Sequence, residues 1–173
     1  DHGVTDEGVS AFPAEVTIQM MANFAAGGAA VCVLSASANA SLEVIDVGVN
    51  GDLSQFPSIV QQKVAMGTRN LAKSAAMSHE ELDSALQVGR EAVVRAAKEG
   101  MRCIALGEMG IGNTTSAAIL TGLMCTPDAA LVTGRGTGLS DEQMPVKQRV
   151  VAAAIARLCA MQDDPLECLR EAG

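Results

Sequence analysis

Three short apolar runs most constrain what this chain of 173 residues can fold into. They lie at residues 42–47, 103–106 and 129–133, and a glycine follows each of them. Short apolar runs with branched side chains are typical of parallel strands that are covered on both faces. Because helical stretches separate the runs, we expect residues 1–173 to form a single α/β domain with a mostly parallel sheet and helices on both faces.

The best-marked helix is expected at residues 79–99. Ser78 and Glu81 have the spacing of a capping box, and Gly100 is a C-terminal stop signal. An apolar stripe follows one face of this helix, at Leu82, Leu86, Val93 and Ala97.

Two helices are expected in the first forty residues. The first covers residues 13–24, with Pro13 at its first position. The apolar segment after Gly27 and Gly28 fits a helix or a strand by its pattern, and we favour a helix.

The second half of the chain is expected to hold three helices. The first covers residues 116–124, and the second ends near residue 160. The second has two possible starts, because Ser140 and Gln143 resemble a capping box, whereas Pro145 is itself a good first residue. Asp164 and Pro165 begin the last short helix, which stops at Gly173.

The charge distribution excludes several kinds of partner. The formal net charge is -8, and no block of Lys and Arg is present, so a nucleic-acid surface is not expected. Any phosphate must be held by backbone N–H groups, helix N-termini and one or two cations. This pattern is typical of a site for a small metabolite.

The cysteines and histidines give no sign of a disulfide framework or a metal site. The five cysteines include no C-x-x-C pair, and the two histidines, His2 and His79, lack ligand-like spacing. The apolar stretch at residues 27–40 is too short to span a bilayer, and no signal peptide precedes it. We therefore expect a cytoplasmic protein with reduced thiols that does not bind membranes.

The most informative segment is the sequence GEMGIGNTT at residues 107–115. Gly110 and Gly112 permit close approach of the backbone to a ligand, and the helix that follows offers free N–H groups to an anion. Asn113, Thr114 and Thr115 can cap that helix or donate to the same anion. A tight strand-to-helix turn with ordinary capping is an equal alternative.

A second glycine-rich turn, GRGTG, occupies residues 134–138 and also follows an expected strand. The carboxyl ends of parallel strands gather ligands at one edge of a sheet, so both turns are expected to open there. Lys147 can reach back from the next helix to an anion in this turn, although a lone lysine is more often only solvated.

Four motifs in this order resemble the nicotinate-nucleotide:dimethylbenzimidazole phosphoribosyltransferase family, the CobT family. They are DHGVTDEGVSAFPAEVT at 1–17, EVIDVGV at 43–49, GEMGIGNTTSAA at 107–118 and TGRGTGL at 133–139. The resemblance implies a Rossmann-like sheet and a homodimer. It also implies that a leading segment with the first strand and a long C-terminal segment are absent, because family proteins are about twice this length.

The resemblance implies phosphoribosyl transfer from nicotinate mononucleotide to dimethylbenzimidazole, giving α-ribazole phosphate and nicotinate without a metal or organic cofactor. In the family the general base is a glutamate in the C-terminal part, for which this chain has no match. Glu108 matches a second carboxylate of the family's site. We therefore expect this chain alone to have little or no activity.

The resemblance also assigns the site residues. The nucleotide is expected at Gly110, Asn113, Thr114, Thr115, Gly136, Gly138 and Lys147, and the aromatic acceptor at Asp1, His2, Phe12, Met20 and Met109. By helical spacing alone Met20 is a core residue, and Phe12 can equally be a hydrophobic staple before Pro13.

Two other functions remain open from the sequence. One is a binding module that holds a nucleotide or an aromatic base without catalysis. The other is a nicotinamide-dependent oxidoreductase, which is disfavoured because the chain has no G-x-G-x-x-G followed by an acidic residue that binds ribose.

Overall fold

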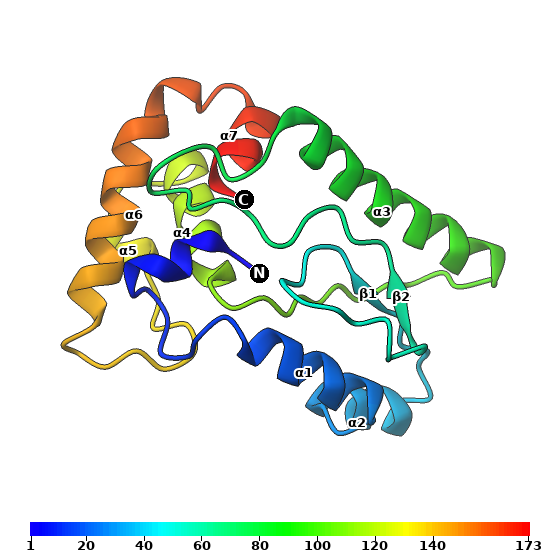
Figure 1. The fold of residues 1–173 in the computed structure, drawn as a ribbon. Helices are drawn as coiled ribbons and strands as arrows, with labels where there is room; N and C mark the ends of the chain where they lie inside the picture. The colour runs from blue at the N-terminus through cyan, green and yellow to red at the C-terminus, as the bar shows by residue number, and fades with distance from the viewer.

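The computed structural model describes all of residues 1–173 as a small parallel sheet with helices around it (Figure 1). The elements are η1 (Gly3–Glu7), α1 (Val16–Ala25), α2 (Ala30–Ser37), β1 (Val44–Asp46), β2 (Ile59–Gln61), α3 (His79–Lys98), α4 (Asn113–Met124), α5 (Ala129–Val132), α6 (Met144–Leu158), η2 (Cys159–Met161) and α7 (Pro165–Ala172). The expected α/β class is confirmed.

The sheet consists of β1 and β2, which pair in parallel with Val44 opposite Ile59 and Asp46 opposite Gln61. Helix α3 lies on one side of this pair, and α1 and α2 lie on the other (Figure 1). The prediction of a strand within residues 42–47 is confirmed. Strand β2 was not predicted, because it has only three residues and no long apolar run marks it.

Two strand predictions are wrong. Residues 103–106 are exposed and form no strand, because no neighbouring strand supplies backbone partners; Leu106 is 93% exposed. Residues 129–132 form α5 instead, because the Asp128 carboxylate accepts hydrogen bonds from the N–H groups of Ala130 and Leu131. This N-terminal cap starts a helical turn despite the β-favouring apolar sequence.

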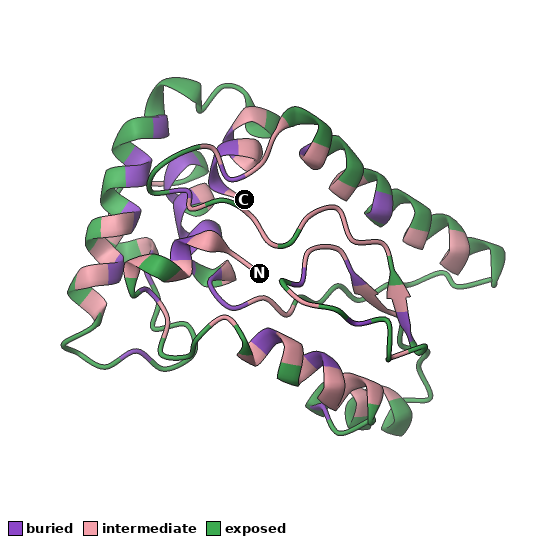
Figure 2. Cartoon of the chain, viewed as in Figure 1, coloured by how far each residue is buried: buried purple, intermediate pink, exposed green.

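Helix α3 has the predicted capping box, with Ser78 Oγ accepting from Glu81 N–H and Glu81 Oε2 accepting from Ser78 N–H. The predicted apolar stripe is only partly correct. Leu82 is buried, but Val93 is 50% exposed and Ala97 is also exposed. The C-terminal half of α3 contributes almost no buried surface (Figure 2).

The first two helices are present, but α1 begins at Val16 and the three residues before it form a turn rather than a helix. The segment Val16–Ser37 is long and apolar enough by composition to cross a membrane. In this structure it is two helices, α1 and α2, separated by a break at which Gly27 has a φ of 74°.

Both start signals before α6 are used. Ser140 and Gln143 exchange hydrogen bonds in the turn, and Pro145 lies in the first turn of the helix that begins at Met144. Helix α7 begins as predicted, with the Asp164 carboxylate accepting from the N–H groups of Leu166 and Glu167.

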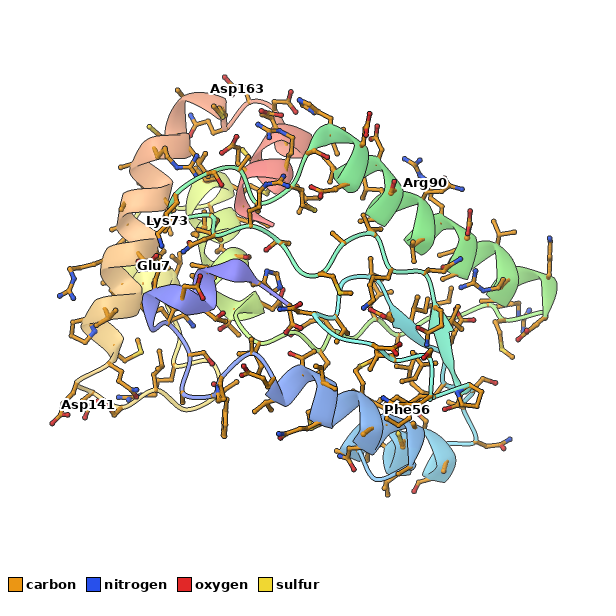
Figure 3. All side chains as sticks on the ribbon, in the orientation of Figure 1. Glu7, Phe56, Lys73, Arg90, Asp141 and Asp163 are labelled. Atoms are coloured by element: carbon orange, nitrogen blue, oxygen red, sulfur yellow. The ribbon has the colours of Figure 1, made fainter.

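The larger core lies among α4, α6, α7 and η1, where most of the buried residues gather (Figure 2). A smaller cluster of Met21, Val49, Leu53 and Ile59 joins α1 to the sheet. Polar contacts add to this framework. Glu7 of η1 accepts a hydrogen bond from Asn70 and pairs with Lys73 at 3.1 Å, and Glu7 and Lys73 lie next to each other in Figure 3.

Candidate functional site

The two glycine-rich segments meet at the N-terminus of α4. Lys147 of α6 donates one hydrogen bond to Thr114 Oγ1 at 2.7 Å and another to the carbonyl of Gly134 at 3.1 Å. Gly136 lies against the same two side chains, since a Cβ built on it would be 2.7 Å from Thr114 Oγ1 and 3.1 Å from Lys147 Nζ. The two turns therefore lie together as expected, but not at the ends of parallel strands, because neither residues 103–106 nor residues 129–133 form a strand.

Lys147 is fully buried and forms no ion pair with a carboxylate. Burial lowers the pKa of its ammonium group, because the charged form has lost water without gaining a counter-charge. A buried, unpaired cation is costly, and an anion beside it would offset that cost. Lys147 is thus not the solvated surface lysine that the sequence left as an alternative.

The start of α4 adds further donors. Gly112 occupies the N-cap with a φ of 100°, so no side chain caps this helix end. The Thr115 hydroxyl is buried and has no hydrogen-bond partner, and the Thr133 hydroxyl just before the second turn is in the same condition. Free donors beside a buried lysine at a helix N-terminus are the elements of an anion site.

The turn at 134–138 also touches the N-terminal part of the chain. Ser10 Oγ and Thr137 Oγ1 are 3.4 Å apart, and Ser10 Oγ accepts a hydrogen bond from Phe12 N–H. The loop before α1 therefore borders the turn. Gly138, with a φ of 106°, lies in the same turn, but a Cβ on it would have no neighbouring atom within 4 Å.

A second group of residues surrounds the first residue of the chain. Thr17 of α1 donates to Asp1 Oδ1 at 2.5 Å and accepts from Ile111 N–H at 3.2 Å. Asn50 N–H donates to the other Asp1 oxygen at 2.7 Å. The Asp1 carboxylate thus ties α1 and the loop after β1 to the loop before α4.

His2 lies behind this loop. Its Nδ1 is 3.3 Å from Ser116 Oγ, and its ring would be 3.6 Å from a Cβ on Gly110. Burial, together with the positive charge of the chain's amino group, lowers the pKa of His2 to about 4. A neutral His2 therefore supports the loop from within, through contacts with Gly110 and Ser116.

Sequence patterns did not reveal an ion pair beside these residues. Asp46, at the end of β1, is fully buried, accepts from Val49 N–H, and pairs with Lys63 at 2.7 Å. Burial lowers the pKa of the Asp1 amino group, and the carboxylates of Asp46 and Glu108 act in the opposite direction. Asp46 was detectable as an acid inside the apolar run at residues 42–47.

The remaining predicted residues are less closely joined. Glu108 is exposed and makes no hydrogen bond or ion pair, and Phe12 is 48% exposed. Met20 and Met109 are half-buried, on α1 and in the loop before α4. Asn113 is half-buried at the first position of α4. Phe12, Met20 and Met109 belong to neither of the two clusters of buried apolar side chains.

The metal-ligating and thiol side chains form no metal site and no disulfide. No group of three or more His, Cys, Asp and Glu side chains lies close enough to hold a metal ion. All five cysteines are free thiols, and only Cys168 is buried.

Comparison with known proteins identifies relatives that cover the whole of this chain. A family model described as Phosphoribosyltransferase matches residues 1–173. A nicotinate-nucleotide–dimethylbenzimidazole phosphoribosyltransferase from Chromobacterium violaceum is 50% identical over 173 residues, which are 100% of this chain and 50% of that protein. Its counterpart from Thermus thermophilus is 48% identical and is covered over 51% of its length.

The crystal structure of CobT from Thermus thermophilus superposes on 100% of this chain with a TM-score of 0.93 and 48% identity, and 52% of that chain is covered. The chain thus spans about half the length of the relatives it matches. It belongs to the phosphoribosyltransferase family that contains the nicotinate-nucleotide–dimethylbenzimidazole phosphoribosyltransferases.

Proposed function

We propose that this chain is the nucleotide-binding part of an enzyme that transfers the phosphoribosyl group of nicotinate mononucleotide to dimethylbenzimidazole. The products are α-ribazole phosphate and nicotinate, in assembly of the nucleotide loop of cobalamin. The observation that carries the proposal is Lys147, buried without a counter-charge between the two glycine-rich turns. The printed names of the relatives support the choice of substrates.

In this proposal the phosphate of the mononucleotide lies beside Lys147, Thr114 and Gly136. The free donors at this helix start are the buried hydroxyl of Thr115 and the N–H group of Thr114, because the N–H groups of Asn113 and Thr115 already donate to Gly110 and Gly112. Gly110 and Asn113 approach the ribose from the loop before α4, and Gly138 completes the second turn. Lys147 acts as a fixed point charge whose position is set before the substrate arrives.

The acceptor is proposed to lie on the side of Asp1 and His2, against Phe12, Met20 and Met109. A flat, apolar base requires a slot lined by apolar side chains. Since Phe12 is exposed in the structure, the slot closes only when the ligand or further chain covers it. Asp1 and His2 position this side through Thr17, Gly110 and Ser116.

The chemistry is a displacement at the anomeric carbon of ribose. A ring nitrogen of dimethylbenzimidazole forms the new bond with inversion, while the bond to the pyridinium nitrogen breaks and its electron pair neutralises the departing nicotinate ring. The other benzimidazole nitrogen gives its proton to a base. Glu108 is proposed to orient the acceptor or assist this proton transfer, and positioning both substrates lowers the barrier.

We also propose that residues 1–173 act as one nucleotide-binding domain in a cytoplasmic homodimer, with no metal or organic cofactor. The acidic net charge is consistent with a partner that is a small metabolite rather than a nucleic acid.

Calorimetric titration with nicotinate mononucleotide tests the binding site. We expect the 173-residue chain to bind the mononucleotide, and Thr114→Val to bind it at least tenfold more weakly, since one charge-assisted hydrogen bond is worth about 1.5–3 kcal/mol. Lys98→Met, which removes an exposed lysine on α3, is the matched control and should bind as the parent does. Equal binding by Thr114→Val and the parent contradicts the proposed site.

A transfer assay separates the enzyme from the alternative, a non-catalytic module that binds a nucleotide or an aromatic base. The exposed, unpaired Glu108 favours weak turnover by this chain alone. We therefore expect chromatography to detect little or no α-ribazole phosphate from the 173-residue chain, and clear product from a protein of the relatives' full length. Comparable turnover by both proteins overturns the expectation, and no turnover by either favours the binding module.

A further inference from the structure

Helices α4 and α6 run parallel to each other, because two contacts between them have the same spacing in the sequence. Lys147 of α6 reaches Thr114 near the start of α4, and Ile155 of α6 lies against Gly122 of α4. In each pair the residue of α6 comes 33 positions after the residue of α4. The two helices therefore begin side by side and stay in register along their length.

One turn beyond the contact at Gly122, each of these helices carries a cysteine. Cys125 follows Gly122 by three positions, and Cys159 follows Ile155 by four. Both cysteines still donate a helical hydrogen bond from the backbone N–H to the carbonyl four residues earlier. Residues three or four positions apart share one face of a helix, so each cysteine lies on the face that meets the other helix.

The two cysteines line one cavity at this end of the helix pair. The cavity has a volume of about 460 Å³, and Met124 and Pro127 form part of its apolar wall. This volume is within the range of small-molecule sites. The cavity is remote from the proposed phosphate site, because the 12 residues of α4, about 18 Å of helix, separate the two.

Both thiols in the cavity are accessible to a ligand. Cys168, in contrast, is part of the larger core, where a cysteine acts as a small apolar side chain. Cys125 and Cys159 are free and exposed, so neither is needed to fill the core. Exposed, free thiols are the ones that can meet a reagent or bind a soft atom.

We propose that Cys125 and Cys159 form a dithiol site for a ligand that has one soft, thiophilic atom and one apolar substituent, namely an organic trivalent arsenical. Both sulfurs bind the arsenic, and the substituent lies in the cavity against Met124 and Pro127. With phenylarsine oxide, two arsenic–sulfur bonds form while the arsenic–oxygen bond breaks. The oxygen leaves as water with the two thiol protons, and arsenic stays trivalent, so no oxidant is required.

A zinc ion fits this cavity less well. Structural zinc sites use four protein ligands, and no group of three or more His, Cys, Asp and Glu side chains lies close enough to hold a metal ion. A trivalent arsenic atom with one organic substituent needs only two protein thiols. The pair of cysteines and the apolar wall beside them supply both requirements.

Mass spectrometry of the intact 173-residue chain with phenylarsine oxide tests the site. We expect each chain to gain one phenylarsenic group, and peptide mapping to show that Cys125 and Cys159 are the two thiols protected from iodoacetamide. The group should resist a wash with roughly millimolar monothiol, because its second bond to the protein is intramolecular. Dimercaptopropanol, a dithiol, should remove it.

Serine variants separate a dithiol site from binding to single cysteines. Cys125→Ser and Cys159→Ser should each retain at least about tenfold less phenylarsenic after the monothiol wash, because only one bond remains. Cys103→Ser removes an exposed thiol that does not line the cavity, so this matched control should bind as the parent does.

The proposal is overturned by the absence of an adduct in the parent, by protection of a different pair of cysteines, or by full retention in Cys125→Ser or Cys159→Ser. The peptide map of the parent decides the matter even where a variant fails to fold. None of these outcomes depends on whether nicotinate mononucleotide binds.

Discussion

At the scale of single residues, the buried charge of Lys147 lowers the stability of the fold, and the same charge is what the proposed phosphate site needs. Its buried ammonium has a lowered pKa, so the folded chain holds that proton less tightly than the unfolded chain does. Lys147→Met removes the desolvation penalty and keeps the packing volume. We expect an unfolding free energy in urea that is unchanged or up to about 1 kcal/mol higher, together with at least tenfold weaker binding of nicotinate mononucleotide.

The pH dependence of the unfolding free energy gives a second way to measure the effect of Lys147→Met. In the parent chain, the desolvation penalty of the charged Lys147 is present below the lowered pKa of the folded state. This penalty is relieved as the pH rises towards 10.5, the ordinary pKa of a lysine. Stability of the parent relative to Lys147→Met should therefore increase with pH in that range. A lysine that carries no penalty would give parallel curves for the two proteins.

At the scale of elements, the packing of α4 on α6 depends on Gly122. A Cβ at this position would lie 2.2 Å from Ile155 Cδ1 and 2.9 Å from its Cγ1, and Ile155 is itself buried. We expect Gly122→Ala to lower the free energy of unfolding in urea by about 1–2 kcal/mol, because overpacking outweighs the gain of about 1 kcal/mol in helix propensity.

Two further variants isolate the contact with Ile155. Gly89 in α3 has nothing within 4 Å of a Cβ, so Gly89→Ala should gain up to about 1 kcal/mol from propensity alone. Ile155→Val removes Cδ1, and Gly122→Ala with Ile155→Val should be less destabilised than the sum of the two single changes. Strict additivity would show that the helices do not meet at this glycine.

At the scale of the whole molecule, His2 joins distant parts of the chain. It forms a parallel bridge with Thr68, contacts Ser116 of α4, and lies 3.6 Å from a Cβ position on Gly173 at the end of α7. Folding holds the pKa of His2 at about 4, against an ordinary value of 6.5. Between these values the unfolded chain takes up a proton that the folded chain does not.

The resulting stability is therefore present above pH 6.5 and is lost as the pH falls towards 4. The loss amounts to about 3 kcal/mol, from about 1.4 kcal/mol for each pKa unit. Urea unfolding at several pH values checks this expectation. His2→Asn should be less stable than the parent at pH 7. Its unfolding free energy should fall less steeply than that of the parent between pH 6.5 and 4, because only the carboxylates, which both proteins share, take up protons there. Parallel slopes for the two proteins would contradict the assignment to His2.

Local signals gave correct predictions where one short segment contains all the interacting groups. The capping box of Ser78 and Glu81 and the cap of Asp164 are bonds within a few residues, so the sequence alone located the starts of α3 and α7. The same local chemistry explains an error, because Asp128 caps a helical turn that the apolar run after it had suggested was a strand.

The site was only partly predictable. The sequence marked the glycine-rich turns and Lys147 as candidates for an anion site, but it did not show that Lys147 is buried without a counter-charge. Asp46 with Lys63 and the contact between His2 and Ser116 were missed, because each joins residues that are distant in the sequence. Likewise, whether residues 103–106 form a strand depends on a partner outside the segment.

The sequence by itself determined the family, the α/β class and the helix caps, because motifs and caps depend on the order of neighbouring residues. Only the tertiary structure decided which polar groups are buried, which glycines are crowded and which strand edge stays open. Burial and pairing depend on contacts between distant segments, and a chain's local pattern does not specify which of its segments will supply those contacts.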